Sequence, residues 1–481
     1  MPPDPSLADR LARHGQEHLL RWWDDLSPGA RDRLAGEVAA IDLDGVDRLF
    51  RQLAGDDAAP APDRVGPVEV DRLPRTDGER VARRHVAAVG EAALSAGEVA
   101  VVIVAGGSGT RLGFEGPKGT YPIAPVSAAS LFQIHAEKIV ALGRRHGRTI
   151  PLYVMTSPEN HGATAGFFAE NGNFGLDHVR FFVQGQMPAV DRESGKILLA
   201  SKDHVALSPD GHGGTLYALA APGPTGGPSC LDEMRGRGVR TIFYFQVDNP
   251  MVRIADPAFL GLHRQADAEM SFKVIEKVAP DEKLGVVVRV DGRPQVIEYS
   301  DLPAALAELR EPDGGLQLWA GSIAVHALEC SFVGRLVEGD VKLPFHRAIK
   351  KVAHVGPDGA IVKPASPNAV KFERFIFDAL PLADRHALVE TDRAVEFEPL
   401  KNATGPDSPA TVRQRMSDQF ADWLEAAGAR VERRSDGSVP FGIEISPLYA
   451  LDAAELKAKL EPGLVVDGPL LLGPSGAIHP R

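Results

Sequence analysis

The chain has 481 residues, 44% of them hydrophobic, with 53 Lys and Arg against 65 Asp and Glu. At roughly 150 residues a domain, this length predicts about three domains of a folded protein. The formal net charge of −12 disfavours nonspecific binding to nucleic acids. The 2 Cys lie far apart in the chain and predict neither a disulfide framework nor a Cys-rich zinc site, which favours a cytoplasmic location.

The N-terminal part of the chain reads as helical. Apolar residues recur at helical spacing over residues 7–53, and no basic segment followed by an apolar one marks an export signal. Residues 54–68 are rich in Pro, Ala and Asp without a period, which predicts a semi-rigid linker. With a further amphipathic stretch over 77–96, we expect a helical N-terminal region with a Pro-rich linker over residues 1–97.

Residues 98–389 alternate between short apolar runs and helical or Gly/Pro-rich segments, which is typical of an α/β sheet. The first run, Glu98 to Ala105, predicts a strand buried on both faces. It is far shorter than the roughly 20 residues that span a bilayer, so we expect no membrane partner. A helix is expected over 130–142, and further strands over 152–156, 179–183, 241–247 and 272–278.

Near residue 390 the pattern changes, which predicts a small C-terminal domain over 390–481. Its clearest element is a helix from Ser408 to Ala427, with Ser408 as N-cap and Pro409 in the first helical position. Short strands and turns follow. The expected fold class is therefore α/β, with a mixed central sheet between a helical N-terminal region and a small C-terminal domain that contains β-strands.

The loop after the first strand is the most informative stretch, reading AGGSGTRLGFEGPKG over residues 105–119. Glycines allow close backbone approach, and successive free N–H groups form a cradle for an anion. Two cations, Arg111 and Lys118, stand beside this cradle. The loop therefore predicts binding of a triphosphate. From the end of the strand onward, we expect the backbone to contact the nucleotide at Val104, Ala105, Gly106 and Gly107.

Two familiar phosphate motifs fail on spacing. A dinucleotide fingerprint requires G-x-G-x-x-G, but from Gly107 the loop reads G-S-G-T-R-L-G, with one residue too many. A Walker A loop requires Lys between Gly and Ser or Thr, whereas Lys118 follows Pro and precedes Gly. Both motifs are therefore excluded.

The loop instead resembles the nucleotide loop of sugar-nucleotide pyrophosphorylases, in which GGxGTRL is followed by P-K. Further motifs occur in that family's order, among them SLFQIHAEKI, FFVQGQMPAV, VALSPDGHGG, FYFQVDNPMV, NAVKFERFIFD and EFEPLKNATGPDSPATVR. Over roughly residues 15–450 the chain is similar to the UDP-N-acetylhexosamine pyrophosphorylase branch of the UDP-sugar pyrophosphorylase family. The resemblance implies a glycosyltransferase-A-like, Rossmann-like core over 98–389 that carries catalysis.

It also implies a reaction in which a sugar 1-phosphate attacks the α-phosphorus of UTP and pyrophosphate leaves. Because the attacking group is already a phosphate dianion, positioning and charge neutralisation suffice and no general base is needed. Arg111 is expected to stabilise charge on the α-phosphate and the leaving pyrophosphate, with Lys118 as the second cation. Lys401, in EPLKNA, and Lys371, in NAVKFERF, match lysines near the phosphates.

Asp248 is the expected ligand of Mg²⁺, the one cofactor predicted. It follows the apolar run 241–247, at the carboxyl end of a predicted strand, where open α/β sheets bind ligands. Mg²⁺ commonly takes one or two carboxylates together with phosphate oxygens and waters. The carboxylate at this strand end suits that chemistry.

The remaining site residues follow from the resemblance. Gln184 matches the glutamine that reads the uracil edge, which suits an amide because it donates and accepts together. The backbone at Gly211 is implied to contact uracil, and Glu298 and Tyr299 correspond to a pair that contacts the sugar.

His212 and Ser322 stand where the family's N-acetylhexosamine enzymes carry asparagines that bear on the sugar. A mismatched buried polar group costs about 1–3 kcal/mol. Synthesis of UDP-N-acetylglucosamine and pyrophosphate from UTP and N-acetylglucosamine 1-phosphate is the leading expectation. A UDP-glucose or broad-specificity UDP-sugar pyrophosphorylase stays open.

Outside the enzyme class, the alternative is a non-catalytic nucleotide-sugar sensor. The presence of Arg111, Lys118 and Asp248 argues against it, because a pure binder has little need for the full triphosphate and metal set. The expected partners are UTP and a sugar 1-phosphate, with no nucleic acid and no membrane. No particular oligomeric state is predicted.

Overall fold

The computed structural model describes residues 3–52, 61–223, 226–476 and 478–480. The chain divides into two compact units, each made of three separate segments. Unit 1 comprises Met1–Pro60, Gln184–Ala218 and Val341–Ala379, and unit 2 comprises Ala61–Val183, Leu219–Asp340 and Leu380–Arg481. No helix in the part of the chain that the structure describes is long and apolar enough to cross a membrane.

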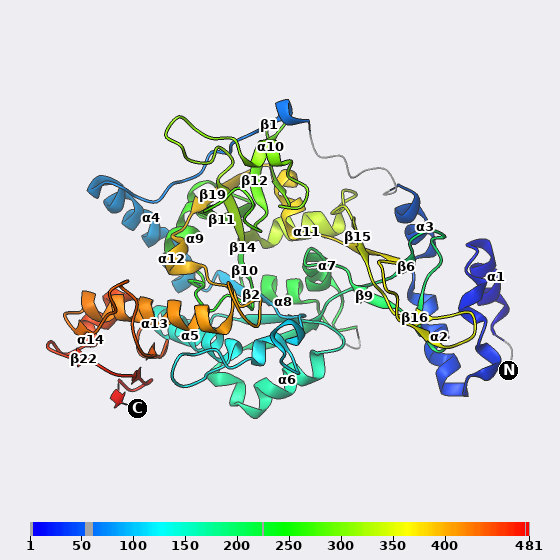
Figure 1. Cartoon of the computed structure of the whole chain (residues 1–481), viewed down its shortest axis with the longest axis horizontal. Helices are drawn as coiled ribbons and strands as arrows, with labels where there is room; N and C mark the ends of the chain where they lie inside the picture. The colour runs from blue at the N-terminus through cyan, green and yellow to red at the C-terminus, as the bar shows by residue number, and fades with distance from the viewer. Residues whose placement is uncertain (1–2, 53–60, 224–225, 477, 481) are drawn as a thin grey trace. The chain divides into compact units, whose positions relative to one another are not determined.

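Unit 1 begins with the expected helices (Figure 1): α1 (Pro5–Arg13), α2 (Pro28–Ala40) and α3 (Leu43–Gln52). Its strands form small sheets, in which β5 (Gln186–Pro188) pairs with β9 (Leu207–Pro209), and β18 (Ala369–Glu373) lies between β15 (His346–Lys350) and β6 (Val190–Asp191). Apolar side chains of the helices share one core with the strands, among them Leu11, Leu34, Val38, Val190, Val370 and Phe372.

Unit 2 is built on a sheet of ten strands whose main path runs β1-β12-β14-β10-β2-β3-β4, with β1 at Val65–Gly66 and β12 at Val286–Val290. Four neighbours in this path are parallel: β10 (Thr241–Gln246), β2 (Val99–Val104), β3 (Leu152–Thr156) and β4 (Val179–Val183). The long strand β14 (Ala320–Glu329) is antiparallel to β10 and to β11 (Met270–Glu276), and β11 pairs in parallel with β19 (His386–Glu390). The mixed central sheet is confirmed, with each strand expected in this region close to its predicted place.

The helices of unit 2 connect these strands. The crossovers of the parallel part are α5 (Leu131–His146) between β2 and β3 and α6 (His161–Glu170) between β3 and β4. Helix α4 (Asp77–Ala96) packs against α9 (Pro257–Gln265), as Figure 1 shows. Helix α5 begins where the Ser130 hydroxyl accepts a hydrogen bond from the Gln133 N–H at 3.1 Å, an N-cap that satisfies one of the free donors of the first turn.

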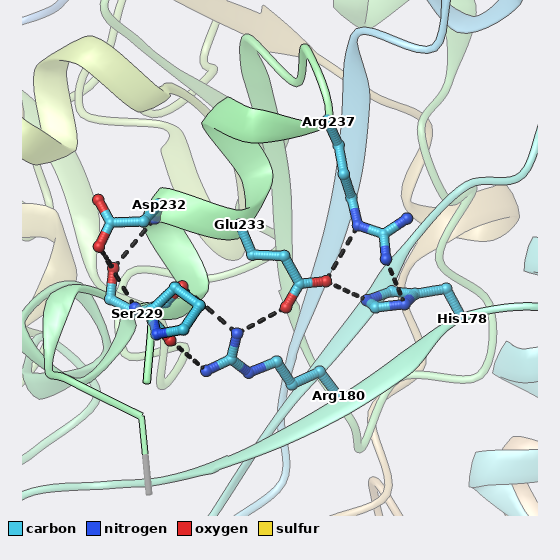
Figure 2. A network of polar contacts seen from close by, with 7 residues as sticks. His178, Arg180, Ser229, Asp232, Glu233 and Arg237 are labelled. Carbon is cyan, nitrogen blue, oxygen red and sulfur yellow. Dashed lines mark hydrogen bonds and ion pairs between the residues drawn. The ribbon is translucent and has the colours of Figure 1, made fainter. Parts of the chain in front are cut away.

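Helix α8 (Cys230–Gly236) is fixed to the start of β4 by a charged network (Figure 2). The Glu233 carboxylate accepts from Arg180 Nη1 at 2.5 Å and from Arg237 Nε at 3.0 Å, and its Oε1 lies 3.0 Å from His178 Nε2. Arg237 Nη2 also donates to His178 Nδ1 at 2.9 Å, so the imidazole carries its proton on Nε2, facing Glu233. Four side chains thus join a strand to a helix some fifty residues away.

The C-terminal segment contains the predicted helix α13 (Pro409–Ala426), capped by the Ser408 hydroxyl, and α14 (Ala453–Lys459). Its short strands form two small sheets, β20 (Arg430–Val431) with β22 (Val465–Val466), and β21 (Ile443–Ile445) with β23 (Leu470–Leu472) and β24 (Ile478–Pro480). Val412 and Phe420 of α13 belong to the same core as strand β2 and helix α5.

The two units do not follow the expected boundaries at 97/98 and 389/390. Residues 184–218 and 341–379 belong with the N-terminal helices, and the C-terminal segment belongs with the central sheet. As functional domains, the ranges 1–97, 98–389 and 390–481 stay a prediction. Residues 54–60 of the expected linker lie outside the described residues, and Val65–Gly66 forms strand β1, which pairs with β12 (Val286–Val290).

Candidate active site

The predicted phosphate loop leaves the sheet at the carboxyl end of β2. Strands β3 and β10 flank β2 in parallel, so all three carboxyl ends meet at one edge. At that edge Ala105 N donates to Met155 O at 2.8 Å, and Val247 N donates to Val104 O at 3.1 Å. Ala105 is buried, whereas Gly107 is exposed. The chain therefore passes from core to surface within three residues.

The loop closes on itself through its backbone. Gly109 N donates to Gly116 O at 2.9 Å, and Lys118 N donates to Gly107 O at 3.1 Å. A Cβ on Gly109 would lie 2.7 Å from Cδ1 of Phe114 and 2.8 Å from its carbonyl oxygen, so this close approach requires glycine. Within the described parts of the chain, the N–H groups of Gly106 and Gly107 donate to no other residue. Such free donors are what an anion cradle requires.

The two predicted cations of the loop differ in their surroundings. Arg111 is exposed, and its guanidinium makes no hydrogen bond or ion pair with any residue that the structure describes. Lys118 is partly buried, and its Nζ lies 3.3 Å from Asp248 Oδ2, with 18% and 14% of the two side chains exposed. The structure thus brings Lys118 to the proposed metal ligand and leaves Arg111 free for a ligand.

Asp248 lies two residues beyond β10 and is held by its backbone. Its carbonyl oxygen accepts a hydrogen bond from Leu400 N at 2.8 Å, which brings the next residue, Lys401, into the same region. The Lys401 backbone N–H in turn donates to Asp407 O at 2.8 Å. Lys118, Asp248 and the segment carrying Lys401 therefore come together at the sheet edge, although they lie far apart in sequence.

Two of the predicted sugar residues of unit 2 converge on Gly285. Ser322 N donates to Gly285 O at 2.8 Å, and a Cβ on Gly285 would lie 3.2 Å from Glu298 Oε1. Ser322 lies on β14 beside a register shift relative to β11, where Ala324 has a φ of 55°. Such bulges redirect side chains next to functional sites. Tyr299 follows Glu298 and is 46% exposed.

The predicted uracil residues belong to unit 1, where Gln184 and Gly211 are hydrogen-bonded. Gln184 is buried, and its Nε2 donates to Gly211 O at 2.9 Å. Gly211 has a φ of +85°, and a Cβ there would lie 2.3 Å from Arg374 O. Only glycine fits this position without displacing the backbone. Gln184 and Gly211, each expected to contact uracil, therefore lie together in one local structure.

His212, which departs from the family pattern, is held in one tautomer. Its Nδ1 accepts a hydrogen bond from Ile376 N at 3.1 Å, so the neutral imidazole carries its proton on Nε2. Burial lowers the pKa of His212 to about 4, and the nearby His346 adds to this effect. The ring stacks on Phe375 at 5.3 Å between centroids. At neutral pH, His212 therefore offers a fixed N–H donor.

The fourth predicted residue of unit 1, Lys371, lies on β18 opposite Ala348 of β15 and is half-buried. It belongs to a different unit from the other predicted cations, Arg111, Lys118 and Lys401. The structure therefore places the predicted residues in two groups, one at the sheet edge of unit 2 and one in the small sheets of unit 1.

Two side chains that shape the site were missed by sequence reasoning. Asn160 is buried, and its Nδ2 donates to Ala105 O at 2.9 Å, which fixes the start of the phosphate loop. His135 on α5 bonds through Nε2 to Val247 O at 3.0 Å, directly before Asp248, and burial lowers its pKa to about 3. Asn160 could have been suspected, because it follows β3 at the same sheet edge. Nothing local marks His135.

The acidic and metal-binding groups at the edge are few. Among the residues described, no three His, Cys, Asp or Glu side chains gather as a metal site. The Asp248 carboxylate, 14% exposed, stands at the sheet edge beside the phosphate loop. That donor set suits Mg²⁺, which is often held by one carboxylate while substrate phosphates and waters complete its octahedron.

Known proteins are similar in sequence to most of this chain. Residues 64–405 match the family model described as UTP–glucose-1-phosphate uridylyltransferase. The chain is 38% identical to human UDP-N-acetylhexosamine pyrophosphorylase-like protein 1, over 100% of this chain and 99% of that protein. It is 35% identical to UDP-N-acetylglucosamine diphosphorylase 2 of Arabidopsis thaliana, over 95% and 91% of the two chains.

Among solved structures, it is similar to the uridine diphosphate N-acetylglucosamine pyrophosphorylase from Trypanosoma brucei in complex with inhibitor. The TM-score is 0.81 at 27% identity, covering 97% of this chain and 98% of that one. This similarity spans nearly the whole of both chains. The chain therefore belongs to the UTP–glucose-1-phosphate uridylyltransferase family, as its motifs predicted.

Proposed function

We propose that the protein transfers a uridylyl group from UTP to N-acetylglucosamine 1-phosphate, forming UDP-N-acetylglucosamine and releasing pyrophosphate. The observation that carries this proposal is the placement of Arg111, Lys118 and Asp248 at the carboxyl edge of β2 and β10. The similarity to relatives named as UDP-N-acetylglucosamine or UDP-N-acetylhexosamine pyrophosphorylases favours the N-acetylated product.

In the proposed reaction, a phosphate oxygen of the sugar 1-phosphate forms a bond to the α-phosphorus of UTP. The bond from that phosphorus to the bridging oxygen of the β-phosphate breaks, and pyrophosphate leaves with the electron pair. No proton has to be removed from the nucleophile, so the protein's work is alignment and charge neutralisation. The free N–H groups of Gly106 and Gly107 and the Arg111 guanidinium are suited to hold the phosphates.

We propose Mg²⁺ as the cofactor, with Asp248 as its protein ligand. When bound, the ion would neutralise negative charge on the phosphate oxygens. Lys118, 3.3 Å from Asp248, would supply a second positive charge beside the same carboxylate. Lys401 would reach the phosphates from the segment that Asp248 holds through Leu400.

The residues of unit 1 are proposed to recognise the base and the sugar. Gln184 and Gly211 would read the uracil edge, and His212 would present its Nε2–H to an acceptor oxygen of the sugar. Lys371 would contribute a charge near the phosphates. In unit 2, Glu298 and Ser322 beside Gly285, with Tyr299, would accept and donate hydrogen bonds to sugar hydroxyls.

A second candidate is a UDP-glucose or broad-specificity UDP-sugar pyrophosphorylase, which the His212 imidazole favours. An amide offers both a donor and an acceptor, whereas the imidazole held by Ile376 offers only a donor. A hydroxyl of an unmodified sugar can accept from that donor as readily as an N-acetyl carbonyl can. No contact of this kind among the described residues favours the non-catalytic sensor. The cations and the carboxylate that the transfer chemistry needs are all present, which argues against it.

The test is pyrophosphate release from UTP with N-acetylglucosamine, N-acetylgalactosamine, glucose and galactose 1-phosphates, each with and without Mg²⁺. We expect release that requires both a sugar phosphate and the metal, with the highest kcat/KM for N-acetylglucosamine 1-phosphate. A higher kcat/KM for glucose 1-phosphate would show that UDP-glucose, and not UDP-N-acetylglucosamine, is the main product. Binding of UDP-sugars without any pyrophosphate release would support the sensor instead.

We also propose a cytoplasmic location for the protein. Cys230 and Cys330 are both free thiols and both buried. Free cysteines are the usual form in reducing compartments, whereas secreted proteins more often oxidise them to disulfides.

A further inference from the structure

Asp248 lies in a turn over residues 247–252, and one side of this turn is held by helix α5. His135 Nε2 bonds to Val247 O at 3.0 Å, before Asp248, and Lys138 Nζ donates to Pro250 O at 2.5 Å and to Val252 O at 3.0 Å, after it. The two side chains are three positions apart and therefore share a face of the helix. Helix α5 thus fixes the backbone on both sides of the proposed metal ligand.

The other side of the turn is held by the neighbouring side chain, Asn249, which is 4% exposed. Its Nδ2 donates to Glu396 O at 2.7 Å, and its Oδ1 accepts from Met251 N at 3.1 Å and from Glu398 N at 3.3 Å. One amide therefore closes the turn and joins it to the segment that leads to Lys401. The hydrogen bond from Leu400 N to Asp248 O extends the same connection.

That segment is itself anchored by charges buried in the core of unit 2. Lys273 Nζ lies 2.6 Å from Glu396 Oε2 and 2.9 Å from Asp256 Oδ2, and the Thr391 hydroxyl donates to Glu396 Oε1 at 2.5 Å. The Lys273 and Glu396 side chains are only 1% and 3% exposed. Buried ion pairs of this kind often stabilise a fold no better than apolar residues would, so stability alone does not account for them.

Packing and polar contacts both restrain this turn, since Met251 and Val252 belong to the hydrophobic core, but one side of the turn borders a cavity. A cavity of about 440 Å³ lies beside the turn, and its lining includes Pro250, Met251, Val252, Lys138 and Val395. Side chains that border a cavity lack partner atoms on that side and so are less restrained by van der Waals contact. The hydrogen bonds of Asn249, together with the bond from Leu400 N to Asp248 O, therefore connect the turn to the Lys401 segment.

We propose that Asn249, supported by the buried Lys273–Glu396 pair, is a positioning residue that sets Lys401 against the Asp248 carboxylate. This inference rests on the proposed function, in which Asp248 holds the metal and Lys401 approaches the phosphates. Asn249 itself touches neither substrate nor metal. Its contribution is the alignment of two groups carried by separate segments, and a misplacement of about 1 Å can reduce a rate about 100-fold.

The central test is Asn249→Ala, followed by kcat for pyrophosphate release and by the dissociation constant of UTP from calorimetry. We expect kcat to fall between about 10-fold and 100-fold, while the UTP dissociation constant changes less than about threefold. A matched control is Asn171→Ala, which removes an exposed amide that donates to Phe167 O at 2.8 Å on helix α6. A kcat for Asn249→Ala within threefold of that control would overturn the proposal.

A second control separates positioning from loss of stability. Val412→Ala deletes two methyl groups from a fully buried side chain of α13. The Val412 side chain has no polar atom, so this change removes none of the hydrogen bonds around Asn249. If Asn249→Ala and Val412→Ala lower the thermal midpoint alike and also lower kcat alike, the role of Asn249 is structural and the proposal fails. A loss of kcat confined to Asn249→Ala supports it.

The support from Glu396 is tested by coupling. Glu396→Gln keeps the shape and the backbone carbonyl but removes the charge that Lys273 binds, and we expect a smaller fall in kcat, of about 3-fold to 10-fold. Because both residues would act through one alignment, the double variant should lose no more than Asn249→Ala alone. If the loss of kcat in the double variant equals the product of the two single losses, the residues act independently and the proposed support of Asn249 by Glu396 is contradicted.

Reference variants keep the proposed function separate from this inference. Asp248→Asn and Lys401→Met should each reduce kcat by more than Asn249→Ala. If either retains wild-type kcat, the proposed roles at the site are wrong, whatever Asn249 does. If both are impaired and Asn249→Ala is not, the site stands and the positioning role fails.

Discussion

Replacement of Arg111 by alanine is the sharpest single test of the proposed site. The side chain is exposed and makes no hydrogen bond or ion pair with another described residue, so its removal should leave the fold unchanged. Surface substitutions of this kind usually change the free energy of unfolding by less than about 0.5 kcal/mol. A large effect on turnover would therefore report on the substrates rather than on the protein.

The size of the effect depends on the solvent around the guanidinium in the complex. Two unit charges 4 Å apart attract by about 1 kcal/mol in bulk water and by about 4 kcal/mol at the effective dielectric constant of about 20 that suits a protein surface. These energies correspond to losses of roughly 5-fold and 1,000-fold when the charge is removed. Because the bound triphosphate would exclude water from the exposed Arg111, we expect a loss of kcat of about 100-fold to 1,000-fold.

The assay is steady-state pyrophosphate release at saturating UTP, with Arg144→Ala on the exposed end of α5 as the matched control. The control should keep wild-type kcat, and both variants should keep the wild-type thermal midpoint. Arg111→Lys should fall between wild type and alanine, since a point charge replaces the planar fork. A loss of less than about 10-fold in Arg111→Ala would refute the assignment of Arg111 to the transition state.

Other residues give narrower predictions. Gly211→Ala should raise the KM for UTP at least about 10-fold, because its Cβ would lie 2.3 Å from Arg374 O; an unchanged KM would argue against a role of this loop in base binding. His212→Asn should raise about 10-fold the ratio of kcat/KM for N-acetylglucosamine 1-phosphate over glucose 1-phosphate, and a constant ratio would remove His212 from sugar selection. Burial raises the pKa of Glu233, but hydrogen bonds from Arg180 and Arg237 outweigh this effect and lower it. The contribution of the Glu233 carboxylate to the free energy of unfolding is therefore complete above the ordinary pKa of 4.5 and is lost as the pH falls through the lowered pKa. Glu233→Gln should therefore cost about 1–2 kcal/mol at pH 7 and progressively less as the pH falls below 4.5, and a gap in thermal midpoint that does not shrink in acid would contradict this account.

The features that sequence predicted best are those written in consecutive residues. The apolar run of β2 and the glycines after it specify a buried strand followed by a tight loop, because each requires a particular residue type at each position. The position of Asp248 at the carboxyl end of a strand follows in the same way, from an apolar run that ends in a carboxylate. The helix capped by Ser408 also follows from local chemistry alone.

The two compact units could not be predicted, because they depend on pairings distant in sequence. Strand β18 joins β6 through Val370 and Val190, 180 residues apart, and both side chains share a core with Leu11 of the first helix. A domain predicted as one continuous range of residues leaves out the segments that join it from elsewhere in the chain. The apolar pattern shows that each of these residues is buried, but it carries no information about its partner.

The supporting side chains of the site escape prediction for a related reason. Asn160 acts on Ala105, 55 residues earlier, and His135 acts on Val247, 112 residues later. Within its own stretch of sequence, each looks like an ordinary residue of a turn or a helix. Their importance follows only from the sheet, which brings three carboxyl ends to one edge and leaves backbone carbonyls there that need donors.

A common principle links these supporting residues to the chemistry proposed for the site. Asn160, His135 and Asn249 each donate from a neutral group to a backbone carbonyl of the site or of the segment that carries Lys401. The amides do not titrate, and the pKa of His135, lowered by burial to about 3, keeps its imidazole neutral through the physiological range. A transfer that needs no general base depends on alignment, and these three donors keep one charge state through that range. The net charge of −12 is compatible with phosphate binding, because the cations proposed to meet the substrate, Arg111, Lys118 and Lys401, are few and local.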